Sequence, residues 1–299
     1  MSLAALKSGL DRLAVLFDKS YRETDPVAVI HRFSDPSDRE VVGFVVSALS
    51  YGAVAQIRRS TNDMLARIDR SPAVFARNLT GRRAKAVFNG FKHRWTDGHT
   101  VARLWCAVGD ILNSHGSLGA FVRSIDNPRD NTIEGTMIRF AERINHVSSL
   151  PSPTFSGTGG KIALIPSPAA GSACKRLAMY FRWMVRGPDG VDFGLWDFIS
   201  PARLVIPLDR HIARMSRRLG LTTRRSDDWK TALDITCSLR RLDPLRYDFA
   251  LVRPGILGIC PPRGNDRCGS CPLNEVCRQT VSYLHPPNTL ILDNRSSPS

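Results

Sequence analysis

The chain has 299 residues, and 42% of them are hydrophobic, a composition that favours a globular protein with a buried core and excludes a disordered tail. Its 42 lysine and arginine residues outnumber 27 aspartate and glutamate residues, which gives a formal net charge of +15. A balance of this size is typical of proteins that bind phosphate groups, although a basic face that meets only solvent would have the same composition.

The longest uncharged stretch, residues 41–57, is too short to span a bilayer and is interrupted by Ser, Gly and Gln. We therefore expect a buried helix there and no membrane segment. The N-terminus carries Lys7, Asp11 and Arg12 where a secretory signal would have its apolar centre. These features predict a cytoplasmic protein.

Helical periodicity dominates the first half of the chain. Leucines at helical spacing predict a helix over residues 3–17. Ser37 and Glu40 have the spacing of a capping box, which predicts the start of the helix that continues through the uncharged stretch. Further helices are expected at about 55–68, 82–92, 100–115 and 131–146. Strand-like alternation is scarce, so the sequence predicts an all-α fold.

Two helices that follow tight turns stand out in the second half. In the first, one face carries Leu177, Tyr180, Phe181 and Met184, and the opposite face carries Lys175, Arg182 and Arg186. We expect the apolar face to be buried and the basic face to point outward. The second helix follows the apolar run 204–208, which places Asp209 at its N-terminus, and Gly220 ends it.

Four cysteines lie close together near the C-terminus: Cys260, Cys268, Cys271 and Cys277. Their spacers of seven, two and five residues allow four thiolates to converge on one centre. An iron–sulfur cluster is favoured, and zinc is the alternative, because structural zinc sites usually combine two short Cys-x2–4-Cys knuckles and only one is present. A pair of disulfides is the third interpretation, which the absence of a secretory signal disfavours.

Three segments carry a resemblance to a known superfamily. Residues 247–277, with the cysteine loop, resemble the C-terminal iron–sulfur loop of endonuclease III and the adenine glycosylases, which are helix-hairpin-helix DNA glycosylases. Residues 205–214 resemble the superfamily segment in which an apolar run precedes a catalytic aspartate. Residues 171–175 resemble its Gly-x-Gly-x-Lys hairpin turn. The chain is similar to a divergent bacterial branch of this superfamily.

The resemblance implies an all-α fold of two helical domains that flank a DNA-binding cleft. Residues 36–186 would form a six-helix barrel domain that ends in the hairpin-like element. Residues 1–35 and 187–285 would form the iron–sulfur domain, which holds a [4Fe-4S] cluster, and residues 286–299 would be a mobile tail. The expected partner is double-stranded DNA, damaged in the base-excision sense, and the expected state is a nucleoid-associated monomer.

The resemblance also implies roles for single residues. Asp209 would stabilise the positive sugar left by the departing base, and Lys175 would be the nucleophile of an AP-lyase reaction. Tyr51 and His211 would contact the substrate. The expected DNA contacts are Gly171, Ser172, Ala173, Arg176, Arg182, Arg214, Arg263 and Arg267.

Two departures from the superfamily pattern leave the activity open. Ala173 replaces the second glycine of the hairpin turn, and residues 184–203 form an insert between Lys175 and Asp209. Trp183 and Trp196, at the ends of this insert, would stack on a base or pack in the core. We therefore expect a DNA glycosylase with AP-lyase activity if Lys175 is a nucleophile. The alternatives are a non-catalytic iron–sulfur DNA-binding protein and a zinc-stabilised RNA-binding protein.

Overall fold

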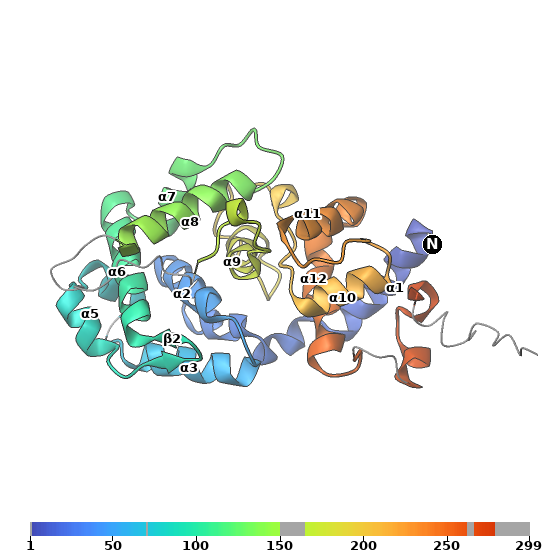
Figure 1. The fold of residues 1–299 in the computed structure, drawn as a ribbon, viewed down its shortest axis with the longest axis horizontal. Helices are drawn as coiled ribbons and strands as arrows, with labels where there is room; N and C mark the ends of the chain where they lie inside the picture. Colours follow the sequence, from blue (N-terminus) through green and yellow to red (C-terminus); the bar gives the residue numbers. More distant parts are fainter. Residues whose placement is uncertain (1, 70, 150–164, 262–265, 279–299) are drawn as a thin grey trace, which may run out of the picture.

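The fold is mostly helical in the part of the chain that the computed structural model describes, which is residues 2–69, 71–149, 165–261 and 266–278 (Figure 1). The α-helices are α1 (Leu3–Leu16), α2 (Pro36–Leu49), α3 (Val54–Ala66), α4 (Pro72–Arg77), α5 (Gly81–Val87), α6 (Gly98–His115), α7 (Leu118–Ile125), α8 (Glu134–Ser149), α9 (Lys175–Val185), α10 (Arg210–Arg218), α11 (Trp229–Ser238) and α12 (Pro244–Ile256). The all-α prediction is confirmed. None of the described helices is both long and apolar enough to cross a membrane.

Short elements connect these helices. Two strands, β1 (Lys92–His93) and β2 (Thr96–Asp97), pair antiparallel and form a small hairpin. The 3-10 helices are η1 (Lys19–Thr24), η2 (Pro26–Arg32), η3 (Pro168–Ala170), η4 (Pro201–Arg203), η5 (Arg240–Leu242), η6 (Asp266–Ser270) and η7 (Asn274–Val276). The predicted tail, residues 286–299, lies outside the described residues, and the predicted domain boundaries stay predictions.

The predicted helix starts need one correction. The N-cap of α2 is Asp35, whose carboxylate accepts hydrogen bonds from the backbone N–H groups of Ser37 and Asp38. Glu40 is not part of a capping box, because its carboxylate accepts from the indole N–H of Trp196 at 2.8 Å and from the backbone N–H of Gly119 at 3.1 Å. The carboxylate therefore joins three segments inside the core.

The predicted helix over 82–92 is also too long. α5 ends at Val87, and the chain then enters the β1–β2 hairpin. The short helices α4 and α7 were not predicted. Each begins at a serine N-cap, Ser71 and Ser117, but each is too short to give a clear periodicity.

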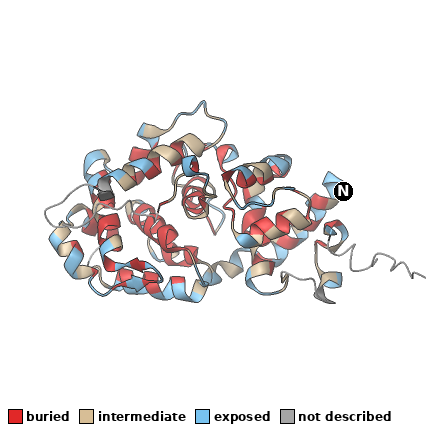
Figure 2. Cartoon of the chain, in the orientation of Figure 1, coloured by how far each residue is buried: buried red, intermediate tan, exposed pale blue. Residues whose placement is uncertain are grey.

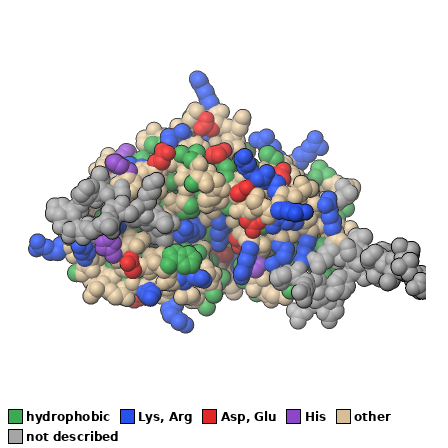
Figure 3. All heavy atoms as spheres, in the orientation of Figure 1, with side chains coloured by type: hydrophobic (Ala, Val, Ile, Leu, Met, Phe, Trp, Pro, Cys, Tyr) green, Lys and Arg blue, Asp and Glu red, His purple; other side chains and the backbone are tan. Residues whose placement is uncertain are grey.

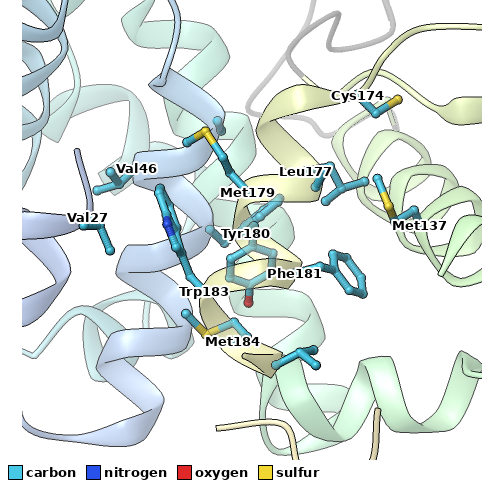
Figure 4. Packing of buried hydrophobic residues seen from close by; sticks show 14 of the residues in the cluster. Val27, Val46, Met137, Cys174, Leu177, Met179, Tyr180, Phe181, Trp183 and Met184 are labelled. Atoms are coloured by element: carbon cyan, nitrogen blue, oxygen red, sulfur yellow. The ribbon is translucent and has the colours of Figure 1, made fainter. Parts of the chain in front are cut away.

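Helix α9 lies at the centre of the fold. In Figure 1, α2 to α8 lie on one side of it, and α1 and α10 to α12 lie on the other. Figure 4 shows α9 side chains packing in more than one direction: Trp183 points toward Val27 and Val46, and Phe181 points toward the side of Met137. Burial therefore extends around the helix, and Figure 2 shows many buried residues on α2 and α9, in the interior of the fold. α9 is a core helix on more than its predicted apolar face.

The N-terminal helix packs against the C-terminal part of the chain. The hydroxyl of Tyr247, in α12, donates to Asp11 of α1 at 2.8 Å, and Arg12 donates to the carbonyl of Pro272 at 3.0 Å. Gly9 lets the two segments approach closely, because a Cβ atom there would lie 3.1 Å from the Pro272 carbonyl. Segments at the two ends of the sequence thus share one packed unit.

The insert between α9 and η4 folds back onto α9. The backbone N–H of Phe193 donates to the carbonyl of Trp183, and that of Trp196 donates to the carbonyl of Met184, both at 2.8 Å. Trp183 is 3% exposed and Trp196 is 1% exposed. Both tryptophans are therefore core residues, which is one of the two roles that the sequence left open.

Arg182 forms a buried ion-pair network in the last turn of α9. Its Nε donates to Asp192 at 3.1 Å, and its Nη1 donates to Asp248 of α12. Burial raises the pKa of the Asp192 carboxyl to about 6, and the charges of Arg182 and Arg186 oppose that rise. Arg182 is only 4% exposed, so the expectation that it belongs to an outward basic face is wrong. A helical period shows which residues share a face but not what packs against that face.

Replacing Arg182 by Met is expected to lower the free energy of unfolding by about 3–5 kcal/mol, because it leaves the buried Asp248 carboxylate without its guanidinium partner and Asp192 with Arg186 alone. Urea unfolding followed by circular dichroism measures the change. Arg143→Met is the control, since the pair of Arg143 with Asp110 is partly exposed and its loss should cost less than about 1 kcal/mol. Equal losses in the two variants would show that the buried network stabilises the fold no more than a partly exposed ion pair does.

Candidate functional site

The largest group of candidate residues lines one cleft of about 790 Å3. Its walls come from the α2–α3 junction, the turn of the hairpin, the start of α9, the segment that leads into α10, and α12. Tyr51, Lys175, Arg176, Asp209 and His211 all contribute to it. The structure thus brings together residues that the sequence placed in three separate motifs. Lys and Arg side chains gather over the middle of the face shown in Figure 3, between α2 and α10.

Asp209 is the N-cap of α10, as the sequence predicts. Its Oδ1 accepts hydrogen bonds from the backbone N–H groups of His211 at 2.8 Å and Ile212 at 2.9 Å. The apolar segment before it is buried, and this fixes the point at which the carboxylate enters the cleft. The helix N-terminus favours a negative charge at this position.

Lys175 is the first residue of α9, and its Nζ lies 3.5 Å from the carbonyl oxygen of Ser50 at the end of α2. The turn that precedes it has two residues in the left-handed region: Gly171 with φ +74° and Cys174 with φ +48°. Glycine is the usual residue in this region, so Cys174 holds a conformation that is uncommon for its type. Burial raises the pKa of the Cys174 thiol to about 11, which keeps it neutral.

Ser172 and Ala173 occupy the middle of the same turn. The backbone of Ser172 forms an isolated antiparallel β-bridge with Asp228. The Ser172 hydroxyl accepts a hydrogen bond from the backbone N–H of Cys174 at 3.3 Å. The backbone N–H of Trp229 donates to the carbonyl of Gly171 at 3.2 Å. The turn is therefore held against the start of α11.

The charges of the cleft act on one another. Burial lowers the pKa of His211, as do the positive charges of Arg214, Arg210 and Lys175, while the charge of Asp209 opposes them. Burial raises the pKa of Asp248, and the charge of Asp209 adds to the rise. His211 is thus favoured in its neutral form. Gly255 of α12 makes room for this ring, because a Cβ atom there would lie 2.3 Å from Nδ1.

Tyr51 lies on the wall opposite α10. Its hydroxyl donates to the carbonyl of His93 at 2.9 Å and lies 2.5 Å from the hydroxyl of Thr96. The guanidinium of Arg176 lies 5.1 Å from the centre of the Tyr51 ring and donates to the carbonyl of Ala48 at 2.7 Å. The hydroxyl is therefore bound within the protein, and the aromatic ring packs against neighbouring side chains of the cleft wall.

Trp95 is the cleft residue that the sequence analysis missed. Its ring stacks on Tyr51, with centroids 4.5 Å apart and planes 20° from parallel, and the residue is 72% exposed. It follows Arg94 in the hairpin turn, just after the segment 82–92 in which the sequence pattern predicts a helix. A tryptophan surrounded by charged and polar neighbours, as in residues 92–97, was the available signal.

The predicted phosphate contacts have mixed surroundings. Arg182 is buried in its ion-pair network, and Arg176 is held between Tyr51 and α2. Arg214 donates to the carbonyl of Cys260 at 2.7 Å and lies 3.3 Å from Nδ1 of His211. Arg263 and the side chain of Arg267 lie outside the described part of the chain.

The four cysteines of the C-terminal loop are free thiols in partly buried positions. Cys260 accepts a hydrogen bond from Arg218 of α10 at 2.6 Å, and its sulfur lies 3.3 Å from that of Met215. Burial raises the pKa of the Cys271 thiol, with smaller contributions from the other three cysteines. Within the described residues, no group of three or more His, Cys, Asp or Glu side chains is arranged to hold a metal ion. The predicted cluster therefore stays a prediction.

Asp209 has a structural role as the N-cap of α10, and any experiment on its function must separate that role from a role in the cleft. Asp209→Ala removes the cap of α10 and is expected to lower the free energy of unfolding by about 1 kcal/mol, whereas Asp209→Asn keeps an N-cap oxygen and should lie within a few tenths of wild type. Urea unfolding of both variants measures this difference. If Asn destabilises the protein as much as Ala does, the negative charge and not the cap stabilises the helix.

Comparison with known proteins adds one finding. Residues 25–257 match the model of a family described as a protein of unknown function, DUF2400, and since this match covers most of the chain, the chain belongs to that family. The matched region contains every cleft residue named above and ends before the first cysteine of the C-terminal loop. No curated protein and no solved structure is significantly similar to the chain.

Proposed function

We propose that this member of the DUF2400 family is a DNA-binding protein of the base-excision type, which hydrolyses the N-glycosidic bond of a damaged base. One observation carries the proposal: Asp209 and Lys175, from two separate motifs, line the same cleft, with Tyr51 also on its wall. The cleft is bordered by α2 and α9 on one side and by α10 and α12 on the other. This arrangement supports two helical units with DNA between them.

The proposed reaction begins with a nucleotide rotated out of the duplex into the cleft. The bond from the sugar C1′ to the base breaks, the base leaves with the bonding electrons, and the sugar gains positive charge. Asp209 stabilises this charge with its carboxylate and accepts a proton from the water that attacks C1′. The cap bonds engage only Oδ1, so this proposal assigns the reaction to Oδ2.

Lys175 is proposed as the nucleophile of an accompanying lyase reaction. Its amine attacks C1′ of an abasic sugar and forms a Schiff base with loss of water, which requires the neutral amine. His211 is proposed as a positioning residue, since it lies in the first turn of the helix that Asp209 caps and its backbone N–H donates to Asp209 Oδ1.

DNA binding is proposed to use the excess of basic residues and the turn before α9. Gly171, Ser172 and Ala173 would approach a phosphate with their backbone, and Arg176 and Arg214 would add positive charge beside the cleft. Arg182 is withdrawn from this set because it is buried and paired. The partner is damaged double-stranded DNA, bound by a monomer in the cytoplasm at the nucleoid.

The cysteine loop is proposed to hold a [4Fe-4S] cluster, with zinc as the alternative. Cys260, Cys268, Cys271 and Cys277 would be the ligands, and the cluster would shape a loop next to α10. The surroundings of Cys260 fit a metal-bound thiolate, because Arg218 directs an N–H group at its sulfur. Such a cluster would have a structural role, and no step of the proposed reaction would depend on it.

A non-catalytic DNA-binding protein is the alternative function. It is favoured by Ala173, which replaces the second glycine of the hairpin turn, and by the uncommon backbone conformation of Cys174. These two features change the turn in which the superfamily holds a phosphate.

The activity is tested on a panel of duplexes, each with one damaged base or an abasic site. We expect base release by wild type and a rate lower by about 10²- to 10⁴-fold for Asp209→Asn, the variant that keeps the helix cap. Borohydride should trap wild type, but not Lys175→Ala, on abasic DNA. No base release and no trapping on any duplex, from protein that binds DNA, would leave the non-catalytic alternative.

The metal is tested by the visible absorption of freshly purified protein. A four-iron cluster gives a brown protein, and Cys268→Ser should remove the colour together with the bound iron. Stoichiometric zinc in a colourless protein would refute the cluster and support the zinc site. Neither metal in protein purified without oxygen would refute both.

A further inference from the structure

Trp95 stands out among the aromatic residues because it is the one tryptophan that the fold leaves exposed. The other four, Trp105, Trp183, Trp196 and Trp229, are 0–3% exposed, whereas Trp95 is 72% exposed. Single exposed apolar side chains are common on proteins and need no function by themselves. Trp95 differs because it lies at the mouth of the cleft and stacks on a second aromatic ring.

The hairpin presents this ring rigidly. His93 is fully buried, and its ring nitrogens lie 2.9 Å from the hydroxyl of Ser60 and 3.1 Å from the carbonyl of Tyr51. The hydroxyl of Tyr51 binds back to the carbonyl of His93. The hairpin is therefore attached to α3 and to the end of α2 by side-chain hydrogen bonds on both sides of the turn.

The turn has an unusual backbone. Two-residue hairpin turns require a positive φ, which glycine or asparagine usually supplies, and here Arg94 adopts φ +54°. This conformation costs on the order of 1 kcal/mol for a residue with a side chain. Gly52 accommodates the Arg94 side chain, since a Cβ atom at Gly52 would lie 2.9 Å from it.

Two guanidinium groups accompany the aromatic pair. Arg94 lies 4.9 Å from the centre of the Trp95 ring, and Arg176 lies 5.1 Å from the centre of the Tyr51 ring. Aromatic rings with adjacent positive charge bind nucleic acid through stacking on a base and attraction to its phosphate. An apolar ligand would match the rings but not the two cations.

We propose that the ledge formed by Trp95 and Tyr51 stacks an unpaired nucleobase at the mouth of the cleft. The proposal depends on the proposed function only in taking nucleic acid as the ligand, and it makes Trp95 a binding residue. Tyr51 supports Trp95 from below with its ring while its hydroxyl fixes the hairpin. The base is recognised by its flat face, so the ledge accepts different bases.

The test measures binding by fluorescence anisotropy to three labelled ligands: a fully paired DNA duplex, the same duplex with one unpaired base, and single-stranded RNA. Trp95→Ala is expected to weaken binding of the duplex with the unpaired base by roughly 5- to 150-fold, the range that base–aromatic stacking gives. Trp95→Phe should retain most of the affinity, and the paired duplex should change less than about 2-fold. Val15→Ala, an exposed apolar residue of α1, is the control.

Acrylamide quenching gives a second measurement, because the quencher reaches Trp95 far more readily than the four buried tryptophans. Saturating DNA with an unpaired base should protect the wild-type fluorescence, and the paired duplex should protect it less. Equal loss of affinity for paired and unpaired duplexes in Trp95→Ala, or no protection, would overturn the proposal. The same Trp95 dependence with RNA would support the ledge and identify RNA as a source of the base.

The outcomes separate this proposal from the proposed function. Trp95-dependent binding without base release would keep the ledge and refute the glycosylase. Base release at the wild-type rate by Trp95→Ala, with unchanged affinity for the unpaired base, would support the glycosylase and refute the ledge.

Discussion

The buried ion pairs of Arg182 are the interaction on which the rest of the structure depends. They join α9 to the insert through Asp192 and to α12 through Asp248. Lys175, the first residue of α9, and Asp248 both line the cleft. The network that orders the core therefore also positions two lining residues of the cleft. Unpaired charge is costly in such surroundings, and this makes the position of α9 nearly fixed relative to its neighbours.

The positive charge of the chain serves two purposes that composition alone does not separate. Several arginines are used internally: Arg203 pairs with Asp126, Arg253 with Asp25, and Arg77 donates to two backbone carbonyl groups. These side chains hold elements together. Because each Arg–Asp pair is neutral, the net charge of +15 is carried by the remaining basic residues, some of which line the cleft and the surface between α2 and α10.

Sequence patterns predicted local features well and spatial relations less well. The cap role of Asp209 follows from a residue type and the apolar run before it, and the structure confirms it. Ser37 and Glu40 had the spacing of a capping box, but Glu40 forms its bonds with segments that are distant in the sequence. The prediction that Arg182 lies on an outward basic face is wrong for the same reason, since the partners of Arg182 come from other elements. Trp95 was missed because a hairpin with two-residue strands has no periodicity to detect.

Helix α10 connects two regions that the sequence treats as separate motifs. Asp209 caps its first turn, and Arg214 and Arg218, farther along, bind the backbone and the sulfur of Cys260. Nine residues of α-helix make a stiff rod of about 13 Å. One short helix therefore carries the Asp209 carboxylate at one end and the contacts to the cysteine loop along its length, so both regions rest on the packing of α10.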